Sequence, residues 1–204
     1  MQKVLISVIS LLLLVSISCK NETENSDDLT YEKAAVSYLL SQNGTYFYDY
    51  STYVENKSAW NEPSSYSFKL KKTMSSLGNS SEFMAVTVSD GTSVSDYSNC
   101  FGYVEGRDYT YEPFYSINSI SDWLNYIENY YRESIEETNK TSATKNTVKI
   151  TWNVINGLKY PKTVSFTSEN YESLINQIIT SNPLFAATGG NSTVVYEILD
   201  FSVE

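Results

Sequence analysis

Two dipeptides place tight turns in this chain and strongly limit the folds open to it. Asp90-Gly91 and Asn156-Gly157 each lie between segments in which apolar and polar residues alternate. An Asp-Gly or Asn-Gly pair favours a two-residue hairpin, because both turn positions then need positive φ angles. Strands joined by such turns pair in the antiparallel direction. We therefore predict two β-hairpins within an antiparallel sheet.

Alternation over short runs predicts the remaining strands. Pro161 marks its strand as bulged or as lying at a sheet edge, because proline cannot donate a hydrogen bond to a neighbouring strand. The last strand changes the parity of its apolar residues near Ile198, which predicts a β-bulge there. Trp152 alternates with polar residues, and we expect it in the core. The predicted strands are residues 66–71, 84–89, 92–94, 148–154, 158–166 and 193–203.

Apolar residues spaced three and four apart predict helices. The clearest helix begins after Ser119, with Asp122 completing a weak capping box. The predicted helices are residues 29–42, 45–60, 120–137 and 169–179. Helices inserted between groups of strands indicate the α+β class. We predict an antiparallel sheet of about five to six strands with helices packed on one face.

The predicted helix 45–60 carries an aromatic stripe. Tyr46, Tyr50, Tyr53, Lys57 and Trp60 follow one another at spacings of four, three, four and three. Such a stripe is typical of a helix that packs its aromatic face on a sheet. The alternative is an aromatic platform for sugars. We favour the packed helix, since aromatic residues at helical spacing usually form core.

The N-terminal residues resemble a bacterial lipoprotein signal. Lys3 precedes an apolar run, residues 4–15, which has the length of a signal h-region and is shorter than a membrane span. Ser18 supplies a small residue directly before Cys19, the expected lipidation site. Two or three acyl chains would anchor the chain firmly. The alternatives are an ordinary secreted protein or an uncleaved signal anchor.

These features predict three segments. Residues 1–18 form the signal peptide, and residues 19–29 contain the lipidated cysteine and an acidic tether without apolar residues. Residues 30–204 form a single globular domain. We expect a bacterial envelope location, at the outer membrane or cell surface, with the domain facing the periplasm or the exterior. The membrane is then a partner through the lipid on Cys19.

Composition excludes several classes of function. Fourteen Lys and Arg residues stand against 24 Asp and Glu residues, which disfavours nucleic-acid binding and broad contact with anionic headgroups. Lys69, Lys71 and Lys72 are a local exception, and we interpret them as protection of a strand edge.

The chain has no histidine, so Ser-His and Cys-His relays are absent. We expect no cofactor and no metal site. Cys100, among aromatic residues, is expected to be a buried small hydrophobic side chain.

Residues 99–113 hold the candidate ligand-binding side chains. Tyr103, Tyr109 and Tyr111 are rigid amphipathic groups suited to protein or glycan partners. The same segment contains acidic residues that could bind calcium or act as paired carboxylates, although their spacing departs from that of a calcium loop. These acids are Glu105, Asp108 and Glu112.

The chain resembles the bacterial extracytoplasmic family described as domain of unknown function 6174, over roughly residues 45–203. The motifs that carry the resemblance are Trp60, Ser65-Tyr66-Ser67-Phe68, Val86-Thr87-Val88-Ser89-Asp90-Gly91, Ser119-Ile120, Trp152-Asn153, Gly157-Leu158-Lys159-Tyr160-Pro161 and Glu197-Ile198-Leu199-Asp200-Phe201. The helix predicted after Phe166 departs from the family pattern, which has a short acidic turn there. The resemblance implies a secreted protein or lipoprotein and assigns no catalytic residue.

The residues favour a non-catalytic binding or interaction module presented on a tether. Two alternatives stay open. One is a carboxylate-based hydrolase such as a glycosidase, which needs two acids facing one cleft. The other is a structural surface lipoprotein without a specific ligand.

The lipid anchor leads to a first prediction. Cys19→Ala removes the thiol that would carry the acyl chains, so we expect the variant to leave the membrane fraction. Detergent phase partition of wild type and variant measures this change, and mass spectrometry of the wild-type N-terminus identifies the lipid. Unchanged partition, or a wild-type N-terminus at another residue, contradicts the anchor.

Overall fold

The computed structural model describes residues 26–75, 80–100, 113–140, 143–180 and 191–204. The described residues divide between two units, whose boundary lies between Ala35 and Val36, and the sheet lies in the second unit, Val36–Glu204. Seven strands form one sheet in the order β1-β5-β6-β7-β2-β3-β4. The strands are β1 (Gly44–Phe47), β2 (Tyr66–Met74), β3 (Ser80–Ser89), β4 (Thr92–Asp96), β5 (Thr144–Ile155), β6 (Leu158–Asn170) and β7 (Ser192–Val203). The helices in the described residues are α2 (Ser26–Ser41), α3 (Tyr50–Ala59), η2 (Pro113–Ser116), α4 (Ile120–Lys140) and α5 (Glu172–Thr180).

Both predicted hairpins are confirmed. Asp90 and Gly91 join β3 to β4 with φ angles of 49° and 74°. Asn156 and Gly157 join β5 to β6 with φ angles of 51° and 80°. Positive φ at both central positions is the geometry that matches the twist of the flanking strands. The two turns therefore fix the registers of both hairpins.

The sheet differs from the prediction in two respects: it has seven strands, and it is mixed rather than antiparallel. The reason is β1, which pairs in parallel with β5 so that Tyr46 lies beside Thr147. A helix had been expected to begin at residue 45. Instead α3 begins at Tyr50, after Asp49 in the left-handed region with φ 57°. Three consecutive residues, Thr45, Tyr46 and Phe47, have side chains that favour a strand.

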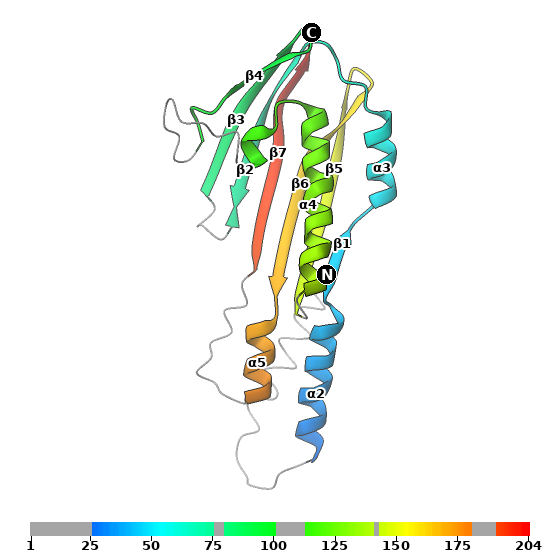
Figure 1. The fold of residues 1–204 in the computed structure, drawn as a ribbon, viewed down its shortest axis with the longest axis vertical. Helices are drawn as coiled ribbons and strands as arrows, with labels where there is room; N and C mark the ends of the chain where they lie inside the picture. Colours follow the sequence, from blue (N-terminus) through cyan, green and yellow to red (C-terminus); the bar gives the residue numbers. More distant parts are fainter. Residues whose placement is uncertain (1–25, 76–79, 101–112, 141–142, 181–190) are drawn as a thin grey trace. The chain divides into compact units, whose positions relative to one another are not determined.

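Helix α4 packs along one face of the sheet (Figure 1). Its N-terminus is capped as predicted, because the Asp122 backbone N–H donates to Ser119 Oγ at 2.9 Å. The reciprocal bond of the predicted box is displaced by one residue, since the Asp122 carboxylate accepts from the Asn118 N–H at 3.1 Å. The Glu62 carboxylate also caps this end and accepts from the Ser121 N–H at 3.0 Å. These contacts satisfy backbone donors that a helix leaves without partners.

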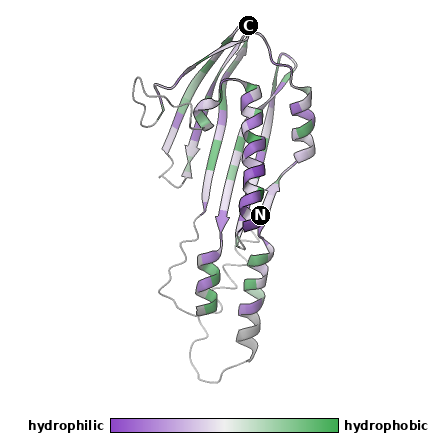
Figure 2. Ribbon diagram, viewed as in Figure 1, coloured by the Kyte–Doolittle hydropathy of each residue, from purple (hydrophilic) through white to green (hydrophobic). Residues whose placement is uncertain are grey.

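The main core lies between α4 and the sheet. Its largest fully buried side chains come from α3, α4, the segment before α4 and the central strands, and they are Trp123, Tyr53, Tyr66, Phe68, Leu70, Met84, Ile117, Ile120, Leu124, Ile127, Ile198 and Val86. Hydrophobic and hydrophilic residues alternate along the strands in Figure 2. Trp152, which was expected in the core, is only partly buried and packs against the border of this core. A smaller cluster joins Leu39, Ala143 and Ile175.

Irregular pairing occurs at the two predicted places. On β2, Lys69 pairs with Leu199 of β7, and Ser67 pairs with Ser202. The stretch of β7 between these two pairs is therefore one residue longer than that of β2. The extra residue lies at a bulge, where Asp200 adopts a left-handed conformation with φ 52°. On β6 the pairing with β5 shifts at Pro161, while pairing with β7 begins only at residue 163. The missing N–H of the proline therefore removes no bond to β7.

The burial pattern predicts unequal effects of two aromatic truncations. Phe166, 2% exposed, contacts rings of α4 and β7, so Phe166→Ala should lower the free energy of unfolding by about 3–5 kcal/mol. Trp152→Ala should cost less, because part of that side chain is already in water. Urea denaturation of both variants measures the difference. A larger loss for Trp152→Ala would contradict this arrangement of the core.

Candidate functional site

The site residues expected from the sequence lie outside the described residues. This holds for Cys19, for Tyr103, Tyr109 and Tyr111, and for the acids Glu105, Asp108 and Glu112. Among the described residues, exposed tyrosines gather instead near β1.

Tyr46 and Tyr48 project from the β1 edge of the sheet. They are 42% and 48% exposed, whereas Phe47 between them packs against the core. Side chains alternate along extended chain, so the two tyrosines share one face and Phe47 takes the other. The Tyr48 N–H donates to the Val148 carbonyl at 3.0 Å, which continues the pairing with β5 beyond the end of β1. Both rings therefore stand on backbone that is held by the sheet.

Two lysines of β5 lie over these rings. Lys145 Nζ lies 5.8 Å from the centroid of the Tyr46 ring, and Lys149 Nζ lies 4.9 Å from that of Tyr48. A cation within about 6 Å of a ring face is attracted by the ring quadrupole. We call Tyr46, Tyr48, Lys145 and Lys149 the tyrosine–lysine surface. It combines aromatic area with positive charge at the edge of a rigid sheet.

The tyrosine–lysine surface continues into the sheet face opposite α4, which we call the open face. Its outward side chains come from β5, β6, β7 and β2, and those of Lys69, Lys149 and Thr151 are exposed. Hydroxyl groups line it, as in the pair Thr167 and Thr193, whose Oγ1 atoms lie 3.3 Å apart. The open face is therefore polar and rich in donors and acceptors.

Phe47 explains why the two tyrosines point away from the core. Its ring centroid lies 5.2 Å from Tyr50, 5.0 Å from Tyr53 and 5.1 Å from Tyr131. Edge-to-face and offset contacts at these distances are favourable beyond the area that they bury. This packing ties β1 to α3 and α4. The orientation of Tyr46 and Tyr48 follows from that of Phe47.

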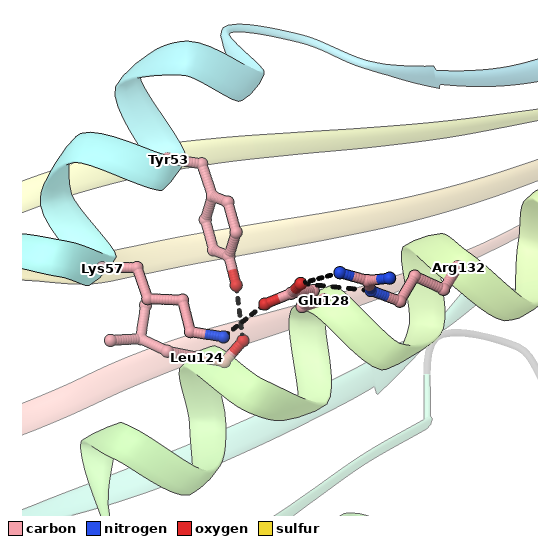
Figure 3. Close-up of polar contacts among 5 residues, drawn as sticks. All are labelled: Tyr53, Lys57, Leu124, Glu128 and Arg132. Atoms are coloured by element: carbon pink, nitrogen blue, oxygen red, sulfur yellow. Dashed lines mark hydrogen bonds and ion pairs between the residues drawn. The ribbon is translucent and has the colours of Figure 1, made fainter.

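Polar contacts also join α3 to α4, as Figure 3 shows. The Tyr53 hydroxyl donates to the Leu124 carbonyl at 2.6 Å. The Glu128 carboxylate pairs with Lys57 and, on its other oxygen, accepts from Arg132 at 2.5 Å. Hydrogen bonds from Lys57 and then from Arg132 hold the pKa of the Glu128 carboxyl below its ordinary value. This group is structural, because its charges are already paired.

A hollow of about 320 Å³ lies beside α4. Its lining is polar and aromatic and consists of Ser116, Asp122, Asn125, Tyr126, Asn129, Tyr130 and Glu133. The two acids are eleven helical residues apart, which places their Cα atoms ~16 Å apart at 1.5 Å per residue. A glycosidase needs its two carboxyl groups within roughly 5–10 Å of each other. The hollow therefore lacks the geometry of a paired-carboxylate site.

Cys100 is buried and free, as expected. Burial, followed by the nearby Glu82 carboxylate, raises the pKa of its thiol to about 12. The thiol is thus protonated at neutral pH and a poor nucleophile. In the described ranges, no three Cys, Asp or Glu side chains gather as metal ligands would. None of the helices in those ranges is long and apolar enough to cross a membrane.

Sequence reasoning missed the open face, although a signal was present. Lys69 and Lys71 were interpreted as protection of a strand edge, but β2 is an inner strand between β7 and β3. Lys72 points the other way and pairs with the buried Glu82 at 3.0 Å. Lysines two or four residues apart in a strand, as at 69 and 71 or at 145 and 149, indicate one solvent-exposed face.

The Glu128 contacts predict a pH dependence. Because the folded-state pKa of Glu128 lies below the unfolded value of about 4.3, its charge stabilises the fold above that pH. The stabilisation is lost as the pH falls through the folded-state pKa. Glu128→Gln should therefore be less stable than wild type at pH 7, with a smaller difference at pH 3. Thermal unfolding at both pH values measures this, and an equal difference would contradict it.

Comparisons with protein-family models, with curated proteins and with solved structures find no match to this chain. The resemblance to domain of unknown function 6174 stays a prediction from the motifs.

Proposed function

We propose that this chain is a lipid-anchored, extracytoplasmic binding module of a bacterial cell envelope and that it recognises glycans. The observation that carries the proposal is the pair of exposed tyrosine rings at the end of β1, held by pairing with β5 and by the packing of Phe47. The lipoprotein-like sequence pattern around Cys19 supports the proposed location in the cell envelope. The absence of histidine from the sequence supports a role without nucleophilic catalysis.

The tyrosine–lysine surface suits sugar rings for two physical reasons. Exposed rings offer rigid, amphipathic contact area at a small entropic cost. The hydroxyls and lysines beside them supply the directional hydrogen bonds that a carbohydrate needs. Tyr46 and Tyr48 stand two residues apart on a strand, so their Cα atoms are separated by ~6.5 Å. That spacing lets neighbouring sugar units meet successive rings.

The hydrolase alternative gains no support from the hollow beside α4. Its acids are widely separated, and Asp122 already accepts a hydrogen bond from the Asn118 N–H. The hollow therefore serves better as a control surface than as a second candidate site. A structural lipoprotein without a ligand is the outcome expected if no glycan binds.

A glycan array with the full chain in detergent micelles tests the proposal. Tyr46→Ala and Tyr48→Ala each remove one stacking ring, so we expect binding to the best glycan to weaken roughly three- to tenfold per ring. Tyr46→Phe and Tyr48→Phe keep the rings and should bind nearly as wild type does.

Asn125→Ala, in the hollow beside α4, is the control and should leave binding unchanged. Circular dichroism checks that each variant is folded. Loss of binding in Asn125→Ala alone would move the site to the hollow. A chain that binds no glycan would contradict the proposal.

A further inference from the structure

We infer that the ligand of the open face is a polyanionic polysaccharide, one that carries carboxylate or sulfate groups along an extended chain. The inference rests on the proposed function and names the chemical class of its ligand. It is carried by the distribution of charge over the two faces of the sheet.

The open face is basic within an acidic protein. On β2, β5, β6 and β7 it carries five lysines, and the acids are fewer, namely Glu169, Glu197 and Asp200. The lysines are Lys69, Lys71, Lys145, Lys149 and Lys162. Helix α4, on the other side of the sheet, carries five acids and only two bases. The sheet therefore separates a basic face from an acidic one, which complements an anionic partner on the open side.

Three of these lysines form no ion pair among the described residues, although Glu197 lies opposite Lys71 and Glu169 lies opposite Lys145 on the neighbouring strands. Lys69 pairs with Asp200 at 2.9 Å, and Lys162 with Glu197 at 3.5 Å. Within the described part of the chain, Lys71, Lys145 and Lys149 have no ion-pair partner. Lys145 and Lys149 contact tyrosine rings instead, which orients their ammonium groups without neutralising them.

The spacing of the three unpaired lysines favours a polymer over a small anion. Lys145 and Lys149 are four residues apart on β5, so their Cα atoms are separated by ~13 Å. Lys71 lies on β2, three strands away from β5, which adds ~14 Å across the sheet. A compact anion reaches one lysine at a time, whereas an extended chain with regular charges reaches all three.

The surroundings favour a polysaccharide over other polyanions. Hydroxyl side chains that are not buried lie between the lysines and suit a partner that itself carries hydroxyls. They are Thr151, Thr163, Ser165, Thr167 and Thr193. Phosphate is bound most specifically by the arginine fork, but the chain has only Arg107 and Arg132. Arg132 lies on α4 and is bonded to Glu128. A lipid surface or a nucleic acid is therefore a poorer fit than a carboxylated or sulfated glycan.

The inference is tested by measuring how the full chain, in detergent micelles, binds three polysaccharides: alginate, dextran sulfate and uncharged dextran. We expect alginate and dextran sulfate to retard the chain in affinity electrophoresis, with little retardation by dextran. Binding should weaken as salt is raised, because each lysine contact releases counterions. Lys145→Gln combined with Lys149→Gln should weaken alginate binding at least tenfold and flatten the salt dependence.

Lys140→Gln, at the end of α4, removes a lysine charge away from the open face and is the control for loss of charge alone; it should bind alginate as wild type does. An equal loss in Lys140→Gln, or preference for anionic vesicles or single-stranded DNA over alginate, would overturn the inference. Binding of uncharged glycans alone would also overturn it while leaving the proposed function intact. Binding of no glycan of either kind would overturn both.

Discussion

The packing of α4 on one face of the sheet is the constraint on which the rest of the structure depends. Trp123, Leu124 and Ile127 are almost fully buried there, so apolar side chains of the strands must turn toward the helix. Strand geometry then sends the intervening residues to the opposite side. That side is accessible at Lys69, Lys149 and Thr151, and a face in water must be polar. The composition of the open face is thus a consequence of where α4 lies.

The packing of the edge strand β1 determines which way Tyr46 and Tyr48 point. Phe47 enters the aromatic cluster of α3 and α4, and the residues on either side of it must then face outward. The bond from Tyr53 to the Leu124 carbonyl holds α3 against α4, next to β1 (Figure 3). Rings that are fixed in this way lose little entropy on binding. A strand of four residues can therefore present a preorganised surface.

Local patterns were predictable from the sequence, and non-local pairing was not. The hairpins at Asp90-Gly91 and Asn156-Gly157, the cap at Ser119 and the bulge beside Ile198 are each determined by a few neighbouring residues. The parallel pairing of β1 with β5 joins residues about a hundred positions apart, and four residues are too few to show a period. Tyr46 was therefore assigned to a helix together with Tyr50 and Tyr53. The exposed tyrosine surface was missed for the same reason.

Net charge says little about what one face of the sheet could bind, because it averages over both faces. The chain carries a formal charge of −10, from which nucleic-acid binding and broad contact with anionic headgroups are expected to be unfavourable. Charges in water are screened within about 8 Å at physiological ionic strength. A helix packed on a sheet holds its outward side chains farther than that from the opposite face, since the two layers lie about 10 Å apart. A polyanion on the open face would therefore be governed by the nearby lysines, and the acids of α4 would act on it only weakly.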